Sequence, residues 1–202
     1  EVGVLTLTPR SQSISSELPG RTAAFMNAEV RPQVNGIVQK RLFTEGALVK
    51  AGQVLYQIDP STYRAALASA KATLSKTQAA ARTARVNADR NAELVKIDAV
   101  SRQVAQESQA QAAQAQADVA AAQAALEAAQ INLDYTQVKA PIAGRVNLSS
   151  VTAGALVTAN QAAPLTTIVQ LDPMYVDFTQ STAELLGLRR DIEAGRYQGV
   201  SN

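Results

Sequence analysis

Residues 110–129 read AQAAQAQADVAAAQAALEAA, and twelve of these twenty residues are alanine. They lie within a longer block, residues 61–134, that contains neither glycine nor proline. All ten glycines and all seven prolines of the 202-residue chain lie outside this block. Alanine is the best helix former, whereas glycine and proline are the worst. The block therefore predicts helix, and its flanks predict strands and turns.

Within the block, small or apolar residues recur at alternating spacings of three and four. The first run consists of Tyr63, Leu67, Ala70, Leu74, Thr77, Ala81, Ala84, Ala88, Asn91 and Val95, and the second of Ala105, Ser108, Ala112, Ala115, Val119, Ala122, Leu126, Ala129 and Leu133. Residues 96–100 break the pattern. Asp59 is suited to cap the first helix with Pro60 at its first position, and Ser101 to cap the second. The pattern predicts an antiparallel helical hairpin with a left-handed, coiled-coil seam.

The two flanks of the hairpin resemble each other. Residues 30–38 (VRPQVNGIV) align with residues 138–146 (VKAPIAGRV), and the same offset of 108 relates the two GALV segments at 46–49 and 154–157. Each copy later reaches an Asp-Pro pair. A match at one fixed offset indicates an internal repeat. Its glycines are expected where strands turn with positive φ, so the repeat predicts two β-rich halves separated by the hairpin.

Composition excludes several classes of function. The chain has no histidine and no cysteine, which removes thiol and imidazole nucleophiles, Cys/His zinc sites and disulfides. Nineteen basic residues balance seventeen acidic ones, without the basic stripe of a nucleic-acid binder. No apolar run is long enough to span a bilayer. The carboxylates are scattered along the chain, so a hydrolase is a remote alternative. The sequence predicts no enzyme activity, no cofactor and no metal site.

A β-sandwich made of two similar halves resembles the lipoyl and biotinyl carrier domains. In those domains a tight turn between the halves presents a lysine that is modified. Here the whole predicted hairpin occupies that junction, and no equivalent lysine turn is present. A carrier-like domain is therefore a remote alternative. A free-standing coiled-coil scaffold, another alternative, would leave the flanking repeat unexplained.

The arrangement of a hairpin inside a split sandwich is similar to the bacterial membrane fusion proteins, the periplasmic adaptors of tripartite efflux pumps. The resemblance is closest to the AcrA/MexA-like adaptors of RND multidrug pumps. The segments that carry it are residues 17–22 (ELPGRT), 28–34 (AEVRPQV), 55–60 (LYQIDP), 154–157 (GALV) and 170–177 (QLDPMYVD). It implies an α+β fold in which an elongated antiparallel coiled-coil hairpin is inserted into a lipoyl-like β-sandwich, followed by part of a β-barrel.

The resemblance also implies a division of the chain. The expected parts are a membrane-proximal strand within residues 1–10, an incomplete β-barrel from residues 11–27 and 173–202, lipoyl-like halves at 28–60 and 135–172, and the hairpin at 61–134. A strand is expected at residues 174–179, because its side chains alternate. Residues 181–184 form a capping-box pattern that predicts a short helix ending at Gly195.

As a member of this family, the chain would link an inner-membrane RND transporter to an outer-membrane channel and form a sealed conduit for multidrug export. The resemblance implies a periplasmic location at the inner membrane and a ring of copies, hexameric in the family. The alternative within the family is an adaptor for another cargo, a metal ion or a protein of type I secretion. The absence of histidine and cysteine disfavours handling of a soft metal.

Family adaptors carry a tip motif, Arg-x3-Leu-x6-Ser, that binds the channel. Arg90, Leu94 and Ser101 match it and bracket the predicted turn. Judged one by one, Arg90 is a surface charge and Ser101 an N-cap, while Leu94 lies off the seam and is expected to be exposed. Together, at this spacing, they are the predicted contact site for the channel.

Overall fold

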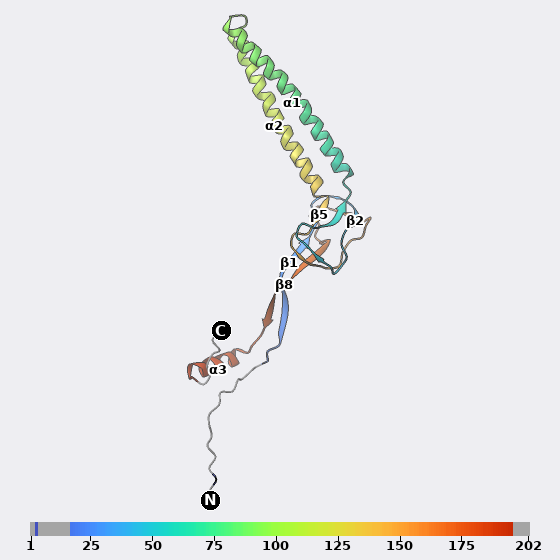
Figure 1. Cartoon of the computed structure of the whole chain (residues 1–202), viewed down its shortest axis with the longest axis vertical. Coiled ribbons are helices and arrows are strands. Elements are labelled where there is room, and N and C mark those ends of the chain that lie inside the picture. Colours follow the sequence, from blue (N-terminus) through green and yellow to red (C-terminus); the bar gives the residue numbers. More distant parts are fainter. Residues whose placement is uncertain (1–2, 4–16, 196–202) are drawn as a thin grey trace. The chain divides into compact units, whose positions relative to one another are not determined.

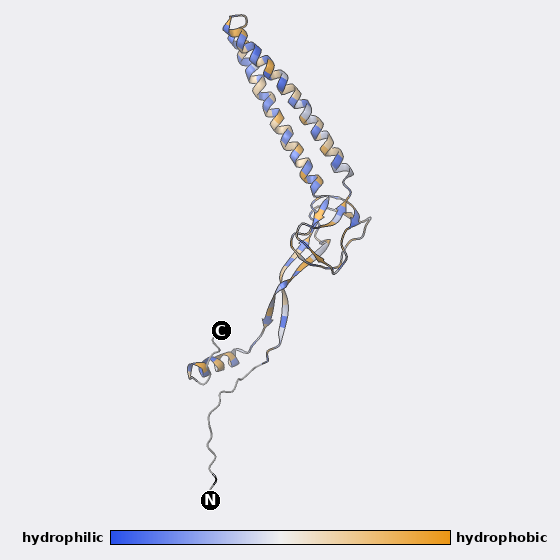
Figure 2. Cartoon of the chain, viewed as in Figure 1, coloured by the Kyte–Doolittle hydropathy of each residue, from blue (hydrophilic) through white to orange (hydrophobic). Residues whose placement is uncertain are grey.

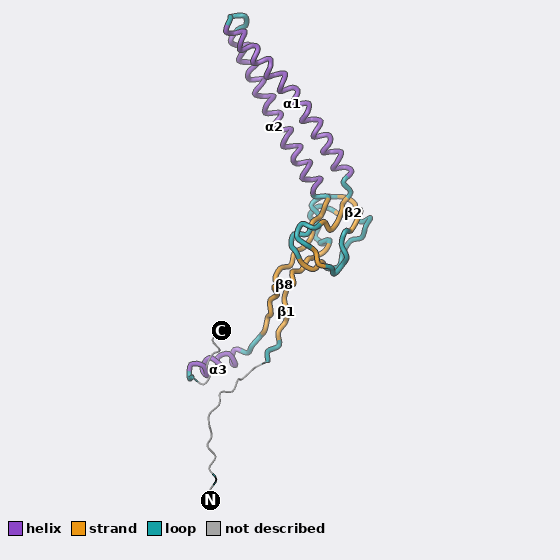
Figure 3. Tube along the Cα trace, viewed as in Figure 1, coloured by secondary structure: helices purple, strands orange, loops and turns teal. Residues whose placement is uncertain are grey.

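The computed structural model describes residue 3 and residues 17–195 (Figure 3). Its elements, in chain order, are β1 (Gly20–Val30), β2 (Gly36–Arg41), β3 (Leu48–Val49), β4 (Val54–Ile58), α1 (Ser61–Lys96), α2 (Arg102–Asp134), β5 (Gln137–Lys139), β6 (Gly144–Val146), β7 (Leu156–Val157), β8 (Thr166–Phe178) and α3 (Thr182–Glu193). Contacts divide the chain into two compact units, residues 26–171 and residues 1–25 with 172–202. The strand expected near the N-terminus lies outside the described residues.

The larger unit contains a β-sandwich whose topology follows the internal repeat. One sheet has the order β5-β4-β2-β7 and the other β1-β8-β6-β3, so each strand of one sheet has its repeat counterpart at the same place in the other. The strand pairs follow the same symmetry. Gly36 of β2 pairs with Val157 of β7, and its repeat counterpart Gly144 of β6 pairs with Val49 of β3. Each half therefore completes the sheet of the other half, and neither sheet forms from one half alone.

Glycine has two different roles in this repeat. Gly46 and Gly154 adopt positive φ of 77° and 92° in the turns, as predicted. Gly144, in contrast, is required by close packing, since a Cβ there would lie 2.5 Å from the carbonyl oxygen of Val169. Gly36 is similar, because its Cβ would lie 2.6 Å from Ile58 Cγ2. Gly36 also keeps a positive φ, 159°, so the expectation was wrong only for Gly144.

The core lies between the two sheets. Its buried members are Val30, Val34, Val38, Val49, Leu55, Tyr56, Ile58, Val138, Ala140, Val146, Val157, Leu165 and Ile168. Tyr56 is the largest of them, and its hydroxyl lies 2.6 Å from Ser149 Oγ and donates to the carbonyl oxygen of Leu165 at 3.1 Å. The ring of Phe43 packs edge-on against Tyr56. Apolar residues from both halves of the repeat thus bury one another.

The hairpin emerges from the sandwich between β4 and β5, and α1 and α2 lie side by side along its length (Figure 1). All nineteen predicted seam residues are buried or half-buried, whereas the other residues of both helices are exposed except Gln78 and Leu94. The seam prediction is confirmed. At the base, Tyr63 donates to the carbonyl oxygen of Asn35 at 2.8 Å, and the carbonyl oxygen of Thr136 accepts from the Ile58 amide at 2.8 Å.

The start of α1 differs slightly from the prediction. The helix begins at Ser61, and Pro60 is the residue that precedes it rather than its first residue. The Asp59 carboxylate still acts near the helix start, because its Oδ1 accepts from the Ser61 amide at 3.0 Å. The missing N–H of Pro60 costs nothing at this point of a helix.

The smaller unit contains α3 and the outer ends of β1 and β8. The strand predicted at residues 174–179 is the end of β8, which runs without interruption through Asp172 and Pro173. Ser181 precedes α3 as expected, but its side chain makes no capping hydrogen bond. Gly195 adopts a φ of 68° just after the helix, in agreement with the predicted end. The assignment of this region to a β-barrel stays a prediction.

Candidate functional site at the hairpin tip

The tip of the hairpin is a tight reversal between α1 and α2. The Asp98 amide donates to the carbonyl oxygen of Val95 at 3.1 Å, and the Ala99 amide donates to that of Leu94 at 3.0 Å. Asp98 lies in the left-handed region with a φ of 54°. These three features define a Schellman motif, in which glycine is the commonest residue at the position of Asp98. The last turn of α1 is therefore closed by backbone hydrogen bonds and not by a flexible linker.

Ser101 caps α2 as predicted. Its backbone is extended, and its Oγ accepts a hydrogen bond from the Val104 amide at 3.3 Å. Because a hydroxyl has one donor and two acceptor sites, this cap leaves the O–H available to another molecule. The side chain is exposed. Ser101 can therefore stabilise the tip and donate to a partner at the same time.

Arg90 lies near the end of α1 and is exposed. The two acidic residues beside it on the helix already have partners, since Arg85 pairs with Asp89 at 3.2 Å and Lys96 pairs with Glu93 at 2.7 Å. Among the described residues, the side chain of Arg90 makes no ion pair and no hydrogen bond. Its guanidinium group keeps five donors for carboxylates or carbonyl groups of another molecule.

The side chain of Leu94 is less exposed than the sequence predicted. It lies one helical turn after Arg90 and is half-buried. In a Schellman motif the second residue after the C-cap, here Ala99, commonly packs against the residue at the position of Leu94. The partial burial of this side chain agrees with such a cap. Only part of Leu94 remains for contact with a partner.

Sequence reasoning missed the most exposed apolar group of the tip. Ile97 is 72% exposed at the end of α1, and Val104 in the first turn of α2 is 43% exposed. Ile97 belongs to residues 96–100, which break the seam pattern and predict a short loop. A large apolar residue within such a break was the available signal. With Leu94, these side chains give the tip an apolar component beside the charge of Arg90.

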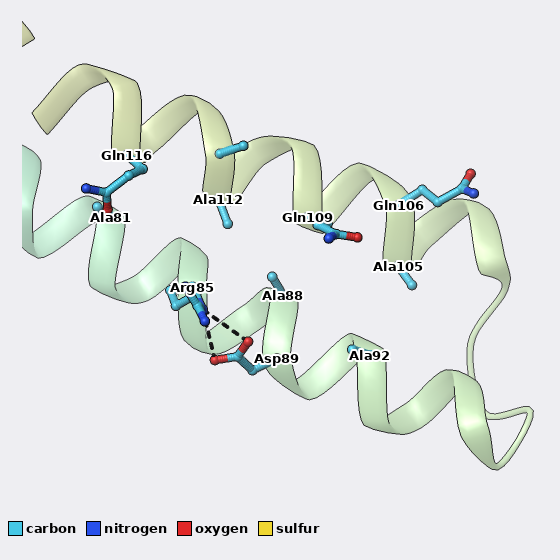
Figure 4. Close-up of a pocket in the computed structure, with 11 residues that line it drawn as sticks. Ala81, Arg85, Ala88, Asp89, Ala92, Ala105, Gln106, Gln109, Ala112 and Gln116 are labelled. Carbon is cyan, nitrogen blue, oxygen red and sulfur yellow. Dashed lines mark hydrogen bonds and ion pairs between the residues drawn. The ribbon is translucent and has the colours of Figure 1, made fainter. Parts of the chain in front are cut away.

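A groove of about 530 Å³ runs along the hairpin between α1 and α2, closer to the tip than to the sandwich (Figure 4). Alanines line its floor, Gln109 and Gln116 extend from α2, and the Arg85–Asp89 ion pair lies on α1. Asp89 is the one carboxylate among the described residues that line it. The groove can accept a side chain or helix surface, but it offers no pair of acid and base groups.

The described residues contain no group of three His, Cys, Asp or Glu that could hold a metal ion. The junction between the two sandwich halves, where a carrier domain would present its lysine, is occupied by the hairpin. None of the described helices combines the length and apolarity needed to cross a membrane, and short polar and apolar patches alternate along α1 and α2 (Figure 2). The tip is the candidate site, and it exposes the guanidinium group of Arg90, the hydroxyl group of Ser101 and the apolar side chain of Ile97.

These features define a class of protein: a β-sandwich that carries a long helical hairpin between its two halves. The family model described as the RND MFP, barrel-sandwich hybrid domain matches residues 26–169. The chain is 52% identical over its whole length to the antibiotic efflux pump periplasmic linker protein ArpA of Pseudomonas putida, covering 51% of that protein. It is 50% identical over 198 residues to the multidrug resistance protein MexA of Pseudomonas aeruginosa, covering 98% of this chain and 48% of MexA.

A solved structure agrees with these relatives. A MacA–MexA chimera that contains the α-hairpin domain of Pseudomonas aeruginosa MexA matches with a TM-score of 0.61 and 34% identity, over 83% of this chain and 55% of the chimera. The chain spans about half the length of the curated relatives it matches. It belongs to the RND membrane fusion protein family, as its sequence predicted. The α+β fold with a hairpin inserted into a lipoyl-like sandwich is confirmed.

Proposed function

We propose that the chain is part of a periplasmic adaptor that links an inner-membrane RND transporter to an outer-membrane channel, in a sealed conduit for multidrug export. The observation that carries the proposal is the hairpin itself: two helices of 36 and 33 residues that end in a capped tip with an exposed, unpaired Arg90. Related proteins are named as periplasmic linkers of antibiotic and toluene efflux pumps. The adaptor would carry out no reaction of its own.

The contact with the channel is assigned to the tip. Arg90 would bind carbonyl or carboxylate groups of the channel, Ser101 would donate its hydroxyl hydrogen to the main chain, and Leu94 would contribute its exposed part. Each contact is weak at a solvated surface. Several copies arranged as a ring, six in the family, would bind through all of their tips together, and such multivalency strengthens the complex without stronger single contacts.

The test compares two charge reversals on α1. Arg90→Asp should abolish drug resistance and cross-linking of the intact adaptor to its channel in cells, because it places an acidic group where the guanidinium binds. Arg82→Asp makes the same change at an exposed position on α1 farther from the tip and should leave both intact. The melting temperature should be unaffected by either change.

Leu94→Ser is a weaker test, because the half-buried side chain also contributes to the end of the hairpin. It should reduce resistance and also lower the stability of the hairpin slightly. Retained resistance and retained cross-linking in both Arg90→Asp and Leu94→Ser would refute the tip assignment. Loss of resistance in Arg82→Asp as well would show that charge on α1 matters in general and not at the tip.

A further inference from the structure

The two helices of the hairpin are attached to the sandwich in different ways. α2 continues directly into β5 through Tyr135 and Thr136, and Thr136 is 1% exposed. Its Oγ1 donates to the carbonyl oxygen of Leu133 at 2.6 Å, and its own carbonyl oxygen accepts from the Ile58 amide at 2.8 Å. The end of α2 is therefore held by a buried residue within the chain connection itself.

α1 is held near its start by a side chain. Pro60 has no N–H to donate, and the Asp59 amide just before it donates to the carbonyl oxygen of Ile37 at 2.9 Å. Inside the helix, the Tyr63 hydroxyl donates to the carbonyl oxygen of Asn35 at 2.8 Å. Among the described residues of α1 and α2, Tyr63 is the one whose side chain hydrogen-bonds to the sandwich, and it also packs against the sandwich core.

Asn35 is itself fixed by the other half of the sandwich. Its Oδ1 accepts from the Ala159 amide at 2.6 Å, in the turn after β7. In the internal repeat, Asn35 corresponds to Ala143 and Ala159 corresponds to Ala51, and an alanine side chain has no acceptor. This side-chain bond therefore belongs to one copy of the repeat only, the copy whose carbonyl group binds Tyr63.

The two turns concerned are otherwise alike. Gly52 and Asn160 occupy the same position and both adopt positive φ, of 79° and 54°. Gln53 and Gln161, which follow them, each accept from a backbone amide at 3.1 Å. Since the turn forms in both copies, Asn35 is not needed to form it. What Asn35 adds is a fixed position for its own carbonyl group.

The base of the hairpin acts on the tip through a long lever. Lys96, the last residue of α1, lies 33 residues after Tyr63, which at ~1.5 Å per residue is about 50 Å. A tilt of about 10° at the base would move the tip by about 9 Å, roughly three times the length of a hydrogen bond. The two chain connections leave a hinge about the line between them, so a further contact is needed to fix the angle of the hairpin.

We propose that the base tether, the chain of hydrogen bonds through Tyr63, Asn35 and Ala159, sets the angle of the hairpin on the sandwich and so positions the tip for its partner. Tyr63 is then a positioning residue, because it acts through the direction of the helices and not through contact with a partner. In a ring of copies, all tips reach the channel together only when every hairpin has the same angle. This inference rests on the proposed contact between tip and channel and adds the residue that directs it.

Tyr63→Phe tests the tether, because it removes the hydroxyl and keeps the ring against the core. Tyr135→Phe is the matched control, since it makes the same change at the base of α2. Tyr135 is 41% exposed, and its hydroxyl makes no hydrogen bond in the described part of the chain. Only the first variant should therefore loosen the hairpin.

Distances between spin labels report the angle in the intact purified protein. One label is placed near the tip, at Gln103→Cys, and the other on the sandwich, at Leu48→Cys or at Leu156→Cys. Both leucines are exposed and lie on edge strands of different sheets, so a tilt changes the two distances by different amounts. Double electron–electron resonance should give broader distance distributions for Tyr63→Phe than for Tyr135→Phe or the natural sequence. Equal widths in all three would overturn the inference.

Substitutions at Asn35 test whether the two hydrogen bonds act as one unit. Asn35→Ala removes the acceptor for the Ala159 amide and should broaden the same distances, whereas Asn35→Asp keeps an acceptor oxygen and should leave them narrow. Asn35→Ala combined with Tyr63→Phe should add little to either change alone, since both break one tether. Fully additive broadening would show that the two residues act separately and would overturn the tether.

The functional readout is cross-linking of the tip to the channel in cells, with the melting temperature as the measure of folding. Tyr63→Phe should lower the yield of the cross-link several-fold while its melting temperature stays close to that of Tyr135→Phe. An unchanged yield together with broadened distances would refute the positioning role and leave the proposed function standing. Absence of any channel cross-link in the protein with its natural Tyr63 would instead refute the proposed function, and with it the role of the tether.

Discussion

The sandwich core and the hairpin seam are held together in different ways. In the sandwich, large residues such as Ile58, Val146 and Ile168 are completely buried. In the two hairpin helices, the buried residues of the described chain are three alanines, Ala81, Ala88 and Ala122, each still 7–8% exposed. Burial of a large aliphatic side chain contributes about 1.5–3 kcal/mol, and an alanine contributes much less.

This difference indicates how the two regions stay folded. The sandwich obtains its stability from apolar burial between two interlocked halves. The hairpin depends on high helix propensity, on a narrow seam and on its attachment at both ends to the sandwich. Such an arm is long and regular but has little stability to spare. It can gain further stability when another molecule packs against its exposed faces.

Ile58→Ala should have the largest effect of the variants that test this comparison. It removes a fully buried side chain from the end of β4, next to the start of α1. Loss of burial together with the resulting cavity costs about 2–5 kcal/mol. Urea denaturation should show the loss in the free energy of unfolding, and the sandwich and the hairpin should unfold together. If Ile58→Ala lowers the free energy of unfolding by less than Ala88→Leu does, the sandwich core is not the main source of stability.

Ala88→Leu tests the seam with a smaller expected effect. Ala88 is 8% exposed between the two helices, so leucine there forces the helices apart. Overpacking of this kind costs about 1–3 kcal/mol. The control is Ala80→Leu, which adds the same side chain at an exposed position of α1. Thermal unfolding followed by circular dichroism should show a lower melting temperature for Ala88→Leu only. Equal melting temperatures would mean that the helices do not pack closely along this seam.

The sequence predicted the seam and the two matching β-rich halves because both depend on regular spacing. A run such as Ala81, Ala84 and Ala88 can face only one side of a helix, and a repeat with one fixed offset brings its copies into equivalent pairings. Both features follow from the spacing of residues along the chain, which does not depend on the size of their side chains.

The details at the tip depend on local geometry instead. Leu94 is half-buried beside a Schellman motif in which Asp98 adopts a positive φ, and that conformation is rarely predictable from an aspartate. Gly144 is similar, since its need for close packing against Val169 arises from a strand 25 residues later in the chain. The tip motif of Arg90, Leu94 and Ser101 came from the family resemblance, and its contact with a channel stays a prediction.

Alkaline pH should produce the smallest effect, and it should originate in the sandwich rather than in the hairpin. Burial raises the pKa of Tyr56 above its ordinary value of 10.0, an effect that the hydrogen bond with Ser149 only partly offsets. The folded protein therefore holds this proton more tightly than the unfolded chain does. The resulting stability is fully present below pH 10 and is lost as pH rises through the higher pKa of the folded state.

The free energy of unfolding, measured by urea denaturation at several pH values above 9, should therefore decrease faster with pH in the natural protein than in Tyr56→Phe. Phenylalanine keeps the apolar ring in the core but has no proton to lose. At neutral pH the same variant loses the hydrogen bonds to Ser149 and Leu165, so it should start from a lower stability. Parallel pH profiles for the two proteins would mean that Tyr56 does not remain buried in solution, and that the sandwich is packed more loosely than its fully buried residues indicate.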